Sequence, residues 1–135
     1  MIYLFYASLL AAVITKVCDC HTTVKYLCPS TECNPIGKRM MRRYGMKVAT
    51  WAIFVIACLE LAFWTGVVLW ADTTWVTAVL TGYVTLGAVL QGGAAHTNST
   101  GRINIVTRPL IKAYRAWGRL WDRRDARRAG ASRAF

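Results

Sequence analysis

The chain has 135 residues, of which 56% are hydrophobic and 17% are charged. This composition is too apolar for an ordinary soluble domain of that length and indicates a membrane protein. Seventeen lysines and arginines against six acidic residues give a formal net charge of +11 at pH 7. The basic residues gather in two blocks, 38–47 and 102–133, outside the longest apolar runs, as is typical of contacts with an anionic membrane surface.

The first predicted element is a membrane-spanning helix over residues 2–24. Its apolar run ends at Thr15, so the helix reaches the roughly 20 residues that cross a ~30 Å hydrocarbon core only by including polar residues. A cleaved signal peptide has a basic start, whereas the first basic residue here, Lys16, follows the apolar run. We therefore expect a retained span with a polar end.

A short basic helix is expected after this span, over residues 35–44. Asparagine is a favoured N-cap, and proline fits the first helical position because the N–H that it lacks would be unpaired there. Asn34 followed by Pro35 therefore predicts the start of this helix, and Gly45 leads from it into the next span.

Two further spans are predicted over residues 48–70 and 75–95, each long enough to cross the hydrocarbon core. The four residues between them predict a tight helical hairpin, in which Asp72 is expected to cap the third span by accepting backbone N–H bonds. Trp70 and Trp75 flank this hairpin, as expected of aromatic residues at a membrane interface.

The last predicted element is an amphipathic helix over residues 109–128. Its aromatic and apolar residues recur every three or four positions, while basic residues occupy the other faces, so we expect it to lie in the membrane surface. A solvated or partner-docked helix is the alternative. The residues expected to clamp anionic lipid or a partner are Arg108, Lys112, Arg115, Trp117, Arg119, Trp121, Arg123 and Arg124.

Together these elements predict an all-α integral membrane three-helix bundle with a short basic connecting helix and a C-terminal amphipathic basic helix. Residues 1–100 would form the transmembrane domain, and residues 101–135 a basic cytoplasmic tail. With three spans, the first connection and the tail lie on one side of the membrane, and both are basic. The positive-inside rule places them in the cytoplasm and the N-terminus outside, in a bacterial inner membrane or a viral membrane.

Glu60 lies at the middle of the second span, where a charged side chain costs at least ~2.5 kcal/mol and is usually paired. Counting residues at 1.5 Å each places Lys16 within about 4–5 Å of the same depth. This predicts a Lys16–Glu60 contact with Thr81 and Thr85 nearby; a protonated Glu60 bonded to a carbonyl or a threonine is the alternative. The complete predicted intramembrane polar cluster is Lys16, Asp19, Thr22, Thr23, Glu60 and Lys47.

Four cysteines and a histidine fall between residues 18 and 33. Cys18, His21 and Cys28 would share a helical face and, with Cys33, form a possible zinc ligand set, although the spacing matches no standard zinc finger. A disulfide such as Cys28–Cys33 is a second reading, which a cytoplasmic location disfavours. Inert thiols are the favoured reading, so no metal and no cofactor is expected.

A motif surrounds the first connection: Asp19-x-x-Thr22-Thr23, then Glu32-x-Asn34-Pro35, and Lys47 at the start of the second span. In this motif, over residues ~15 to 50, the chain resembles a family of small prokaryotic membrane proteins of unknown function. The resemblance implies no activity. We interpret the motif as a structural clamp in which Asp19 or Glu32 pairs with Lys47, with a binding site as the alternative.

The favoured function is a structural or accessory membrane subunit that packs into a larger assembly and clamps anionic lipid or a partner through the basic tail. Partners would be lipid and other membrane subunits or further copies of the chain. A phage holin-like pore and an ion or proton path through Glu60 are the alternatives. Enzymatic activity is not expected, since no nucleophile–base–orienter set is present, and nucleic acid is not favoured as a partner.

Overall fold

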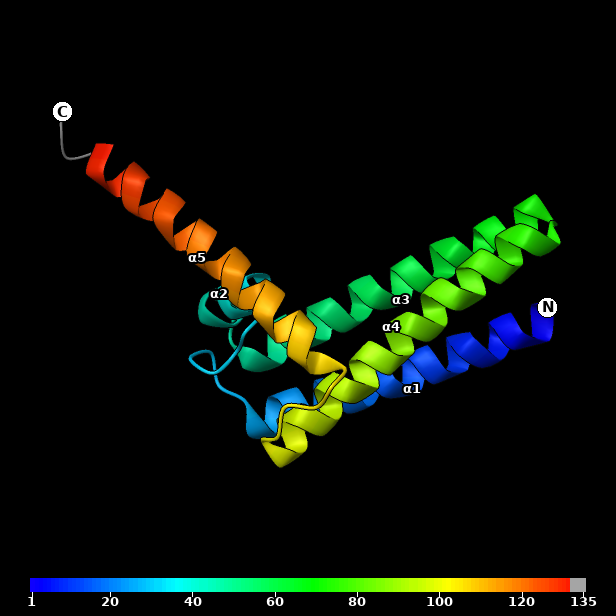
Figure 1. Ribbon diagram of the computed structural model, residues 1–135, viewed down its shortest axis with the longest axis horizontal. Coiled ribbons are helices and arrows are strands. Elements are labelled where there is room, and N and C mark those ends of the chain that lie inside the picture. Colours follow the sequence, from blue (N-terminus) through cyan, green and yellow to red (C-terminus); the bar gives the residue numbers. More distant parts are fainter. Residues whose placement is uncertain (132–135) are drawn as a thin grey trace.

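The computed structural model describes the backbone of residues 1–131 and the side chains of residues 1–121. In this part of the chain all regular structure is helical, and no strand occurs. The elements are α1 (Ile2–Tyr26), α2 (Pro35–Tyr44), α3 (Met46–Ala71), α4 (Thr74–Thr100) and α5 (Thr107–Ala131). Figure 1 shows α1, α3 and α4 side by side as an elongated bundle, with α2 and α5 gathered at the end opposite the N-terminus.

Helices α1, α3 and α4 are each long and apolar enough to cross a membrane. They contain 25, 26 and 27 residues, which gives lengths of about 38–40 Å at 1.5 Å per residue. The prediction of a multi-pass, all-α membrane protein is thereby confirmed. All three helices extend beyond the predicted spans, α4 most of all. The apolar pattern marks only the part that faces hydrocarbon, and the helical hydrogen bonds continue past it.

The hairpin between α3 and α4 differs from the prediction at Asp72. This residue ends α3 in the left-handed conformation, with φ 42°, and its N–H donates to the Val68 carbonyl at 3.3 Å. Thr73 is the N-cap of α4, and no side chain there accepts a backbone N–H bond. The expected cap by Asp72 is wrong, because this residue closes the preceding helix instead of opening the next one.

Helix α2 starts with Asn34, whose Oδ1 accepts a hydrogen bond from the Ile36 N–H at 3.0 Å, and with Pro35 in the first turn. Gly45 both ends α2 and begins α3, with φ 84°. Its ψ is 157°, and this combination of a positive φ with an extended ψ is readily adopted only by glycine. The change of direction between α2 and α3 therefore depends on this one residue.

The Gly45→Ala variant should lower the free energy of unfolding by about 1–2 kcal/mol, since an L side chain is strained at this φ. Gly66 is the matched control, because it lies inside α3 and a Cβ added there would meet no atom within 4 Å. Gly66→Ala should be neutral or stabilising. Thermal unfolding in detergent measures both variants, and equal effects would show that the backbone conformation at Gly45 is not the cause.

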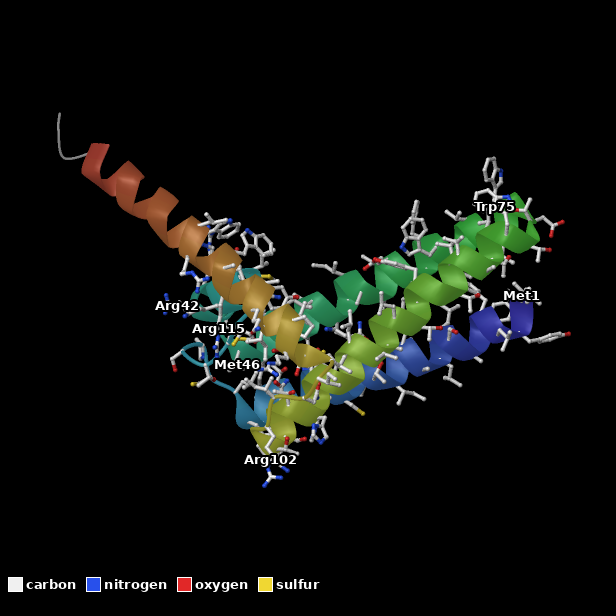
Figure 2. The ribbon with its side chains drawn as sticks, viewed as in Figure 1. Met1, Arg42, Met46, Trp75, Arg102 and Arg115 are labelled. Carbon is white, nitrogen blue, oxygen red and sulfur yellow. The ribbon has the colours of Figure 1, made fainter. Side chains whose placement is uncertain are left out.

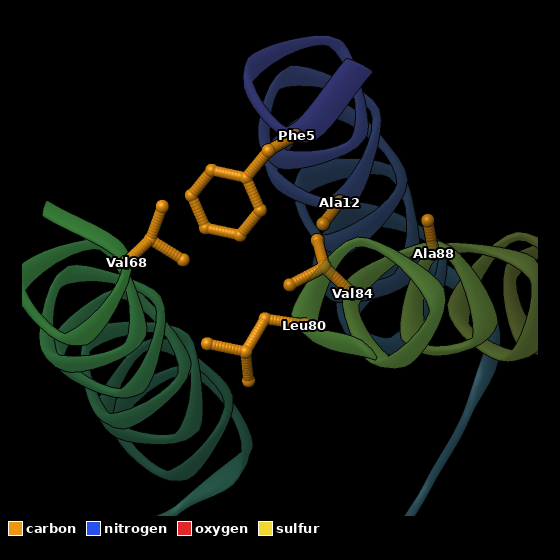
Figure 3. Packing of buried hydrophobic residues seen from close by; sticks show 6 residues of the cluster. All are labelled: Phe5, Ala12, Val68, Leu80, Val84 and Ala88. Carbon is orange, nitrogen blue, oxygen red and sulfur yellow. The ribbon is translucent and has the colours of Figure 1, made fainter. Parts of the chain in front are cut away.

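The core lies where α1, α3 and α4 meet, toward the hairpin end of the bundle (Figure 3). It contains Phe5 and Ala12 of α1, Val68 of α3, and Leu80, Val84 and Ala88 of α4. Phe5 is fully buried among them. Most other large apolar side chains of the spans point outward, as expected of helices that face lipid or another protein.

The connection from α4 to α5 depends on Asn104. Its Nδ2 donates to the Gly93 carbonyl at 2.9 Å and to Thr97 Oγ1 at 3.2 Å, while its Oδ1 accepts the Thr107 N–H at 2.8 Å. Gly93 permits this approach, since a Cβ there would lie 3.1 Å from Val106 Cγ1. These contacts fix the start of α5 against the end of α4.

Candidate functional site

Polar side chains link α1 and α4 along their shared interface. Near the middle of α1, Ser8 Oγ lies 2.9 Å from Thr85 Oγ1, and Thr15 Oγ1 donates to Gln91 Oε1 at 3.4 Å. A Cβ added at Gly92 would lie 3.5 Å from Thr15 Cγ2, so the two helices approach closely there. Hydrogen bonds between spans stabilise one register of the two helices.

The interface ends in an ion pair and an amide. Lys16 Nζ lies 2.9 Å from Asp19 Oδ2, and the two side chains are 13% and 17% exposed. Asn98 Nδ2 of α4 donates to Thr23 Oγ1 at 3.1 Å and to Asp19 Oδ1 at 3.4 Å. Lys16, Asp19 and Thr23 of the predicted cluster are therefore brought together. Asn98 was not predicted as a partner of this cluster, because nothing in the residues around it indicates a contact with α1.

The other members of the predicted cluster lie elsewhere. Thr22 Oγ1 donates to the carbonyls of Cys18 and Asp19, at 2.9 and 3.1 Å, and stays within its own helix. Lys47 is exposed and, within the described residues, pairs with neither Asp19 nor Glu32. The predicted pairing across the connection is wrong, because Asp19 already has a lysine one turn earlier on the same helix.

Glu60 does not contact Lys16 as an ion pair. The hydroxyl of Tyr83 in α4 donates a hydrogen bond to Glu60 Oε1, and both side chains are exposed on the outside of the bundle. Lys16 and Glu60 do line one intramembrane crevice between α1, α3 and α4, together with Tyr83 and Gln91. The predicted contact is wrong because Asp19, three residues along α1, satisfies the ammonium group without help from α3.

The predicted threonine neighbours of Glu60 are also engaged elsewhere. Thr81 Oγ1 donates to the Thr77 carbonyl at 2.6 Å, and Thr85 contacts Ser8. A threonine in a helix readily bonds the carbonyl four residues earlier, which keeps the hydroxyl within its own helix. Tyr83 was missed because its apolar ring suited a lipid-facing position.

The loop after α1 carries a half-buried carboxylate at Glu32. Its Oε1 accepts the Asn34 N–H at 2.7 Å. Burial raises the pKa of Glu32 above its ordinary value of 4.5, and the Asn34 N–H partly opposes this effect. Asp19 raises the pKa of Glu32 further and Lys16 lowers it, so the loop lies within electrostatic range of the ion pair.

Because folding raises the pKa of Glu32, the folded chain holds this proton more tightly than the unfolded chain. The resulting stability is fully present below about pH 4.5 and is lost as the pH rises through the folded-state pKa. Glu32→Gln should flatten this part of the stability profile, because glutamine Oε1 keeps the acceptor for Asn34 and does not ionise. Thermal unfolding from about pH 4 to pH 8 tests this, and a slope unchanged from wild type would contradict it.

A groove separates α2 from α5, and its walls are strongly basic. Figure 2 labels Arg42 of α2 and Arg115 of α5, which lie near one another in this part of the molecule. We call it the basic groove; it is lined by Ser30, Thr31, Glu32, Cys33, Pro35, Lys38, Arg39, Arg42, Tyr114, Arg115, Gly118, Arg119 and Trp121. The Arg39 guanidinium stacks over the Trp121 ring at 5.1 Å from its centroid and joins the two helices. Burial raises the pKa of Tyr114, which also lies near the charges of Glu32, Lys16 and Asp19.

The basic groove contains part of the predicted clamp. Arg115, Arg119 and Trp121 line it, whereas Arg108 and Lys112 are exposed away from it. Trp117 is 37% exposed and meets the Trp121 ring edge-on at 5.5 Å. The side chains of Arg123 and Arg124 lie outside the described residues. The contributions of Lys38 and Arg42 from α2 were not predicted, because the pairing of α2 with α5 is a tertiary contact.

The cysteines do not gather. All five are free thiols, and no group of three His, Cys, Asp or Glu side chains that suits a metal ion occurs in the described part of the chain. Cys18 is exposed and Cys20 is buried, with its Sγ 3.9 Å from the Thr50 carbonyl. Hydrogen bonds with Ser30 and Thr31 lower the pKa of Cys28 to about 7.

Comparisons with known proteins give no relative for this chain. No protein-family model matches it, and neither a curated protein nor a solved structure is significantly similar to it.

Proposed function

We propose that the protein is a structural or accessory subunit of a membrane assembly, and that the outer face of α3 and α4 packs against a transmembrane helix of another subunit. The observation that carries this proposal is the exposed Glu60–Tyr83 pair. Glu60 lies 14 residues after the start of α3 at Met46, so at 1.5 Å per residue it is about 20 Å from the end of the helix.

A carboxyl group at this depth lies far from bulk water, and exposing it to lipid tails is unfavourable by at least ~2.5 kcal/mol if it is ionised. One hydrogen bond from Tyr83 satisfies one acceptor site of the two oxygens. A neighbouring helix that offers a hydroxyl, amide or basic group would satisfy the rest. The apolar residues around Glu60 suit lipid and protein equally, so only the carboxyl group distinguishes a protein partner from lipid.

The distribution of charge supports the predicted orientation. Arg42, Arg102 and Arg115 lie at one end of the molecule, and Met1 and Trp75 lie at the other (Figure 2). A bundle inserted along its long axis would therefore have one strongly basic side, which the positive-inside rule assigns to the cytoplasm. The N-terminus and the α3–α4 hairpin would then be outside.

Photo-crosslinking tests the proposal. A crosslinking amino acid at Leu59, which is 65% exposed beside Glu60, should give an adduct with a second membrane protein that also co-purifies in mild detergent. The same amino acid at Leu10, which is 63% exposed on α1, is the matched control and should give no such adduct. Glu60→Leu should weaken the adduct and Glu60→Gln should preserve it.

Two other outcomes would overturn the proposal. An adduct formed only between copies of this chain, with loss of membrane potential when it is expressed in bacteria, would indicate a holin-like pore. If the chain stays monomeric, gives no adduct and is harmless to cells, the outer face of α3 and α4 contacts lipid and not another subunit.

The intramembrane crevice favours an ion or proton path as a second candidate, since Lys16, Glu60 and Gln91 line it from three helices. This function predicts proton flux across liposomes that contain the purified chain, and loss of the flux in Glu60→Gln while the helix content persists. The subunit proposal predicts no flux in either protein.

A further inference from the structure

The basic groove brings cations from two distant segments together. Lys38, Arg39 and Arg42 come from α2, and Arg115 and Arg119 come from α5. Glu32 is the one acidic residue among the described residues of the lining, and its carboxylate already accepts the Asn34 N–H. Arg39 is engaged in the contact with Trp121, and the other four cations on the facing walls repel one another unless an anion lies between them, so this arrangement favours a negatively charged ligand.

Among the described side chains, residues 1–121, four of these cations have no acidic partner. Lys16–Asp19 is the sole ion pair among the described side chains, and Lys38, Arg42, Arg115 and Arg119 take no part in it. Arginine binds phosphate through two parallel N–H bonds, and lysine adds a point charge. Two pairs of cations on opposite walls, with no ion-pair partner in the part of the chain whose side chains are described, therefore suit a ligand with two phosphate groups.

The walls of the groove are held by the fold. Asn34 and Gly45 fix the two ends of α2, and its Met41 side chain is 4% exposed. On the other wall, Asn104 anchors the first turn of α5, where Thr107 is 2% exposed. The groove therefore exists before any ligand binds, which reduces the entropy that binding must overcome.

The position of the groove favours a lipid. Helix α2 continues through Gly45 directly into the membrane-spanning α3, so its cations lie at the level where α3 enters the bilayer. The groove has a volume of about 860 Å³, which is within the ~300–1,000 Å³ of typical small-molecule sites and larger than one phosphate requires. Basic pockets at the cytoplasmic ends of spans bind lipid headgroups with several negative charges.

We propose that the basic groove binds the headgroup of an anionic membrane lipid that carries two phosphate groups. The proposal rests on the membrane insertion and orientation given under the proposed function. It adds a specific headgroup site, separate from the lateral contact at Glu60, and it assigns Lys38 and Arg42 of α2 to the site together with Arg115 and Arg119 of α5.

Native mass spectrometry of the full chain, released from nanodiscs into mild detergent, tests this site. Cardiolipin in phosphatidylcholine is the probe, and phosphatidylglycerol at equal total charge is the comparison lipid with one phosphate. We expect one cardiolipin to remain bound, with retention at least about tenfold above that of phosphatidylglycerol, since the second phosphate engages the second pair of cations.

Two quadruple variants separate the groove from general surface charge. The first replaces Lys38, Arg42, Arg115 and Arg119 with glutamine. The second replaces Arg43, Arg102, Arg108 and Lys112, which carry the same charges and lie outside the groove lining. The groove variant should retain cardiolipin about 600-fold less, at about fivefold for each of the four cations, and the control variant should resemble wild type.

The outcomes are decisive in both directions. Equal loss in the two quadruple variants, or equal retention of the two lipids, would overturn the site. Displacement of cardiolipin by soluble pyrophosphate at the same concentration would show that the groove binds a soluble anion, and would overturn the proposal that its ligand is a lipid.

Circular dichroism establishes that both variants fold, and Arg115→Lys, which keeps the charge, should lose only part of the retention. Crosslinking at Leu59 distinguishes failure of the headgroup site from failure of the proposed function. If the wild-type chain retains no cardiolipin while the adduct forms, only the headgroup site is refuted, and if the adduct is absent while cardiolipin is retained, only the lateral contact is refuted.

Discussion

The Asp19→Asn variant should lower the free energy of unfolding by about 3 kcal/mol, because it leaves the Lys16 ammonium unpaired inside the bundle. Lys16 Nζ lies 2.9 Å from Asp19 Oδ2, and both side chains are largely enclosed. Lys16→Met should be less harmful, since Asp19 keeps the hydrogen bond from Asn98 and lies one turn closer to the end of α1. Reversible unfolding in mixed detergent micelles measures both variants.

The double variant Lys16→Met with Asp19→Asn provides the control. Because it removes both charges, it should recover most of the stability that Asp19→Asn loses, so the two effects are strongly non-additive. Additive losses would show that each residue acts through separate contacts and that the ion pair contributes little.

Phe5→Ala should destabilise the bundle by about 3 kcal/mol, which is the lower end of the range for buried phenylalanines. Phe5 is 0% exposed and packs among residues of all three spans, so its removal leaves a cavity that no neighbour can fill (Figure 3). In a membrane, this loss of stability comes from lost packing contacts more than from transfer to water, because the unfolded spans also lie in hydrocarbon.

Tyr3→Ala is the matched control for Phe5, since it truncates an aromatic residue of the same helix that is 85% exposed. Its effect should be less than about 0.5 kcal/mol, as for surface substitutions in general. Unfolding of both variants is measured in the same detergent. Similar losses would show that α1 is held by its outer contacts and not by the core.

The spans were predictable from the sequence because they depend on a property of consecutive residues. About 20 apolar residues in a row are enough to indicate a crossing, whatever the rest of the chain does. Asn34 at the start of α2 is a similarly local signal, because its side chain bonds a backbone N–H only two residues away. Asp72 shows the limit of such reasoning, since the same cap preference fails where the chain is already in a left-handed turn.

The candidate site was only partly predictable. Residues on one helical face of α1 could be grouped by periodicity, which identified Lys16, Asp19 and Thr23. Their partner Asn98 is 75 residues away from Thr23 in the sequence and has no special pattern of its own. Depth counting placed Glu60 near Lys16 but carried no information on helix rotation, and rotation directs Glu60 toward Tyr83 on the outer surface.

The sequence alone determined the number of apolar helices and the clustering of positive charge, because hydrophobicity and charge are sums over neighbouring residues. Only the tertiary structure decided which polar groups pair, since pairing depends on the angles and register at which α1, α3 and α4 pack. It also decided that α2 and α5 face each other across the basic groove. Asn104 and Gly45 set that arrangement through a side-chain anchor and a positive φ, and neither produces a periodic pattern in the sequence.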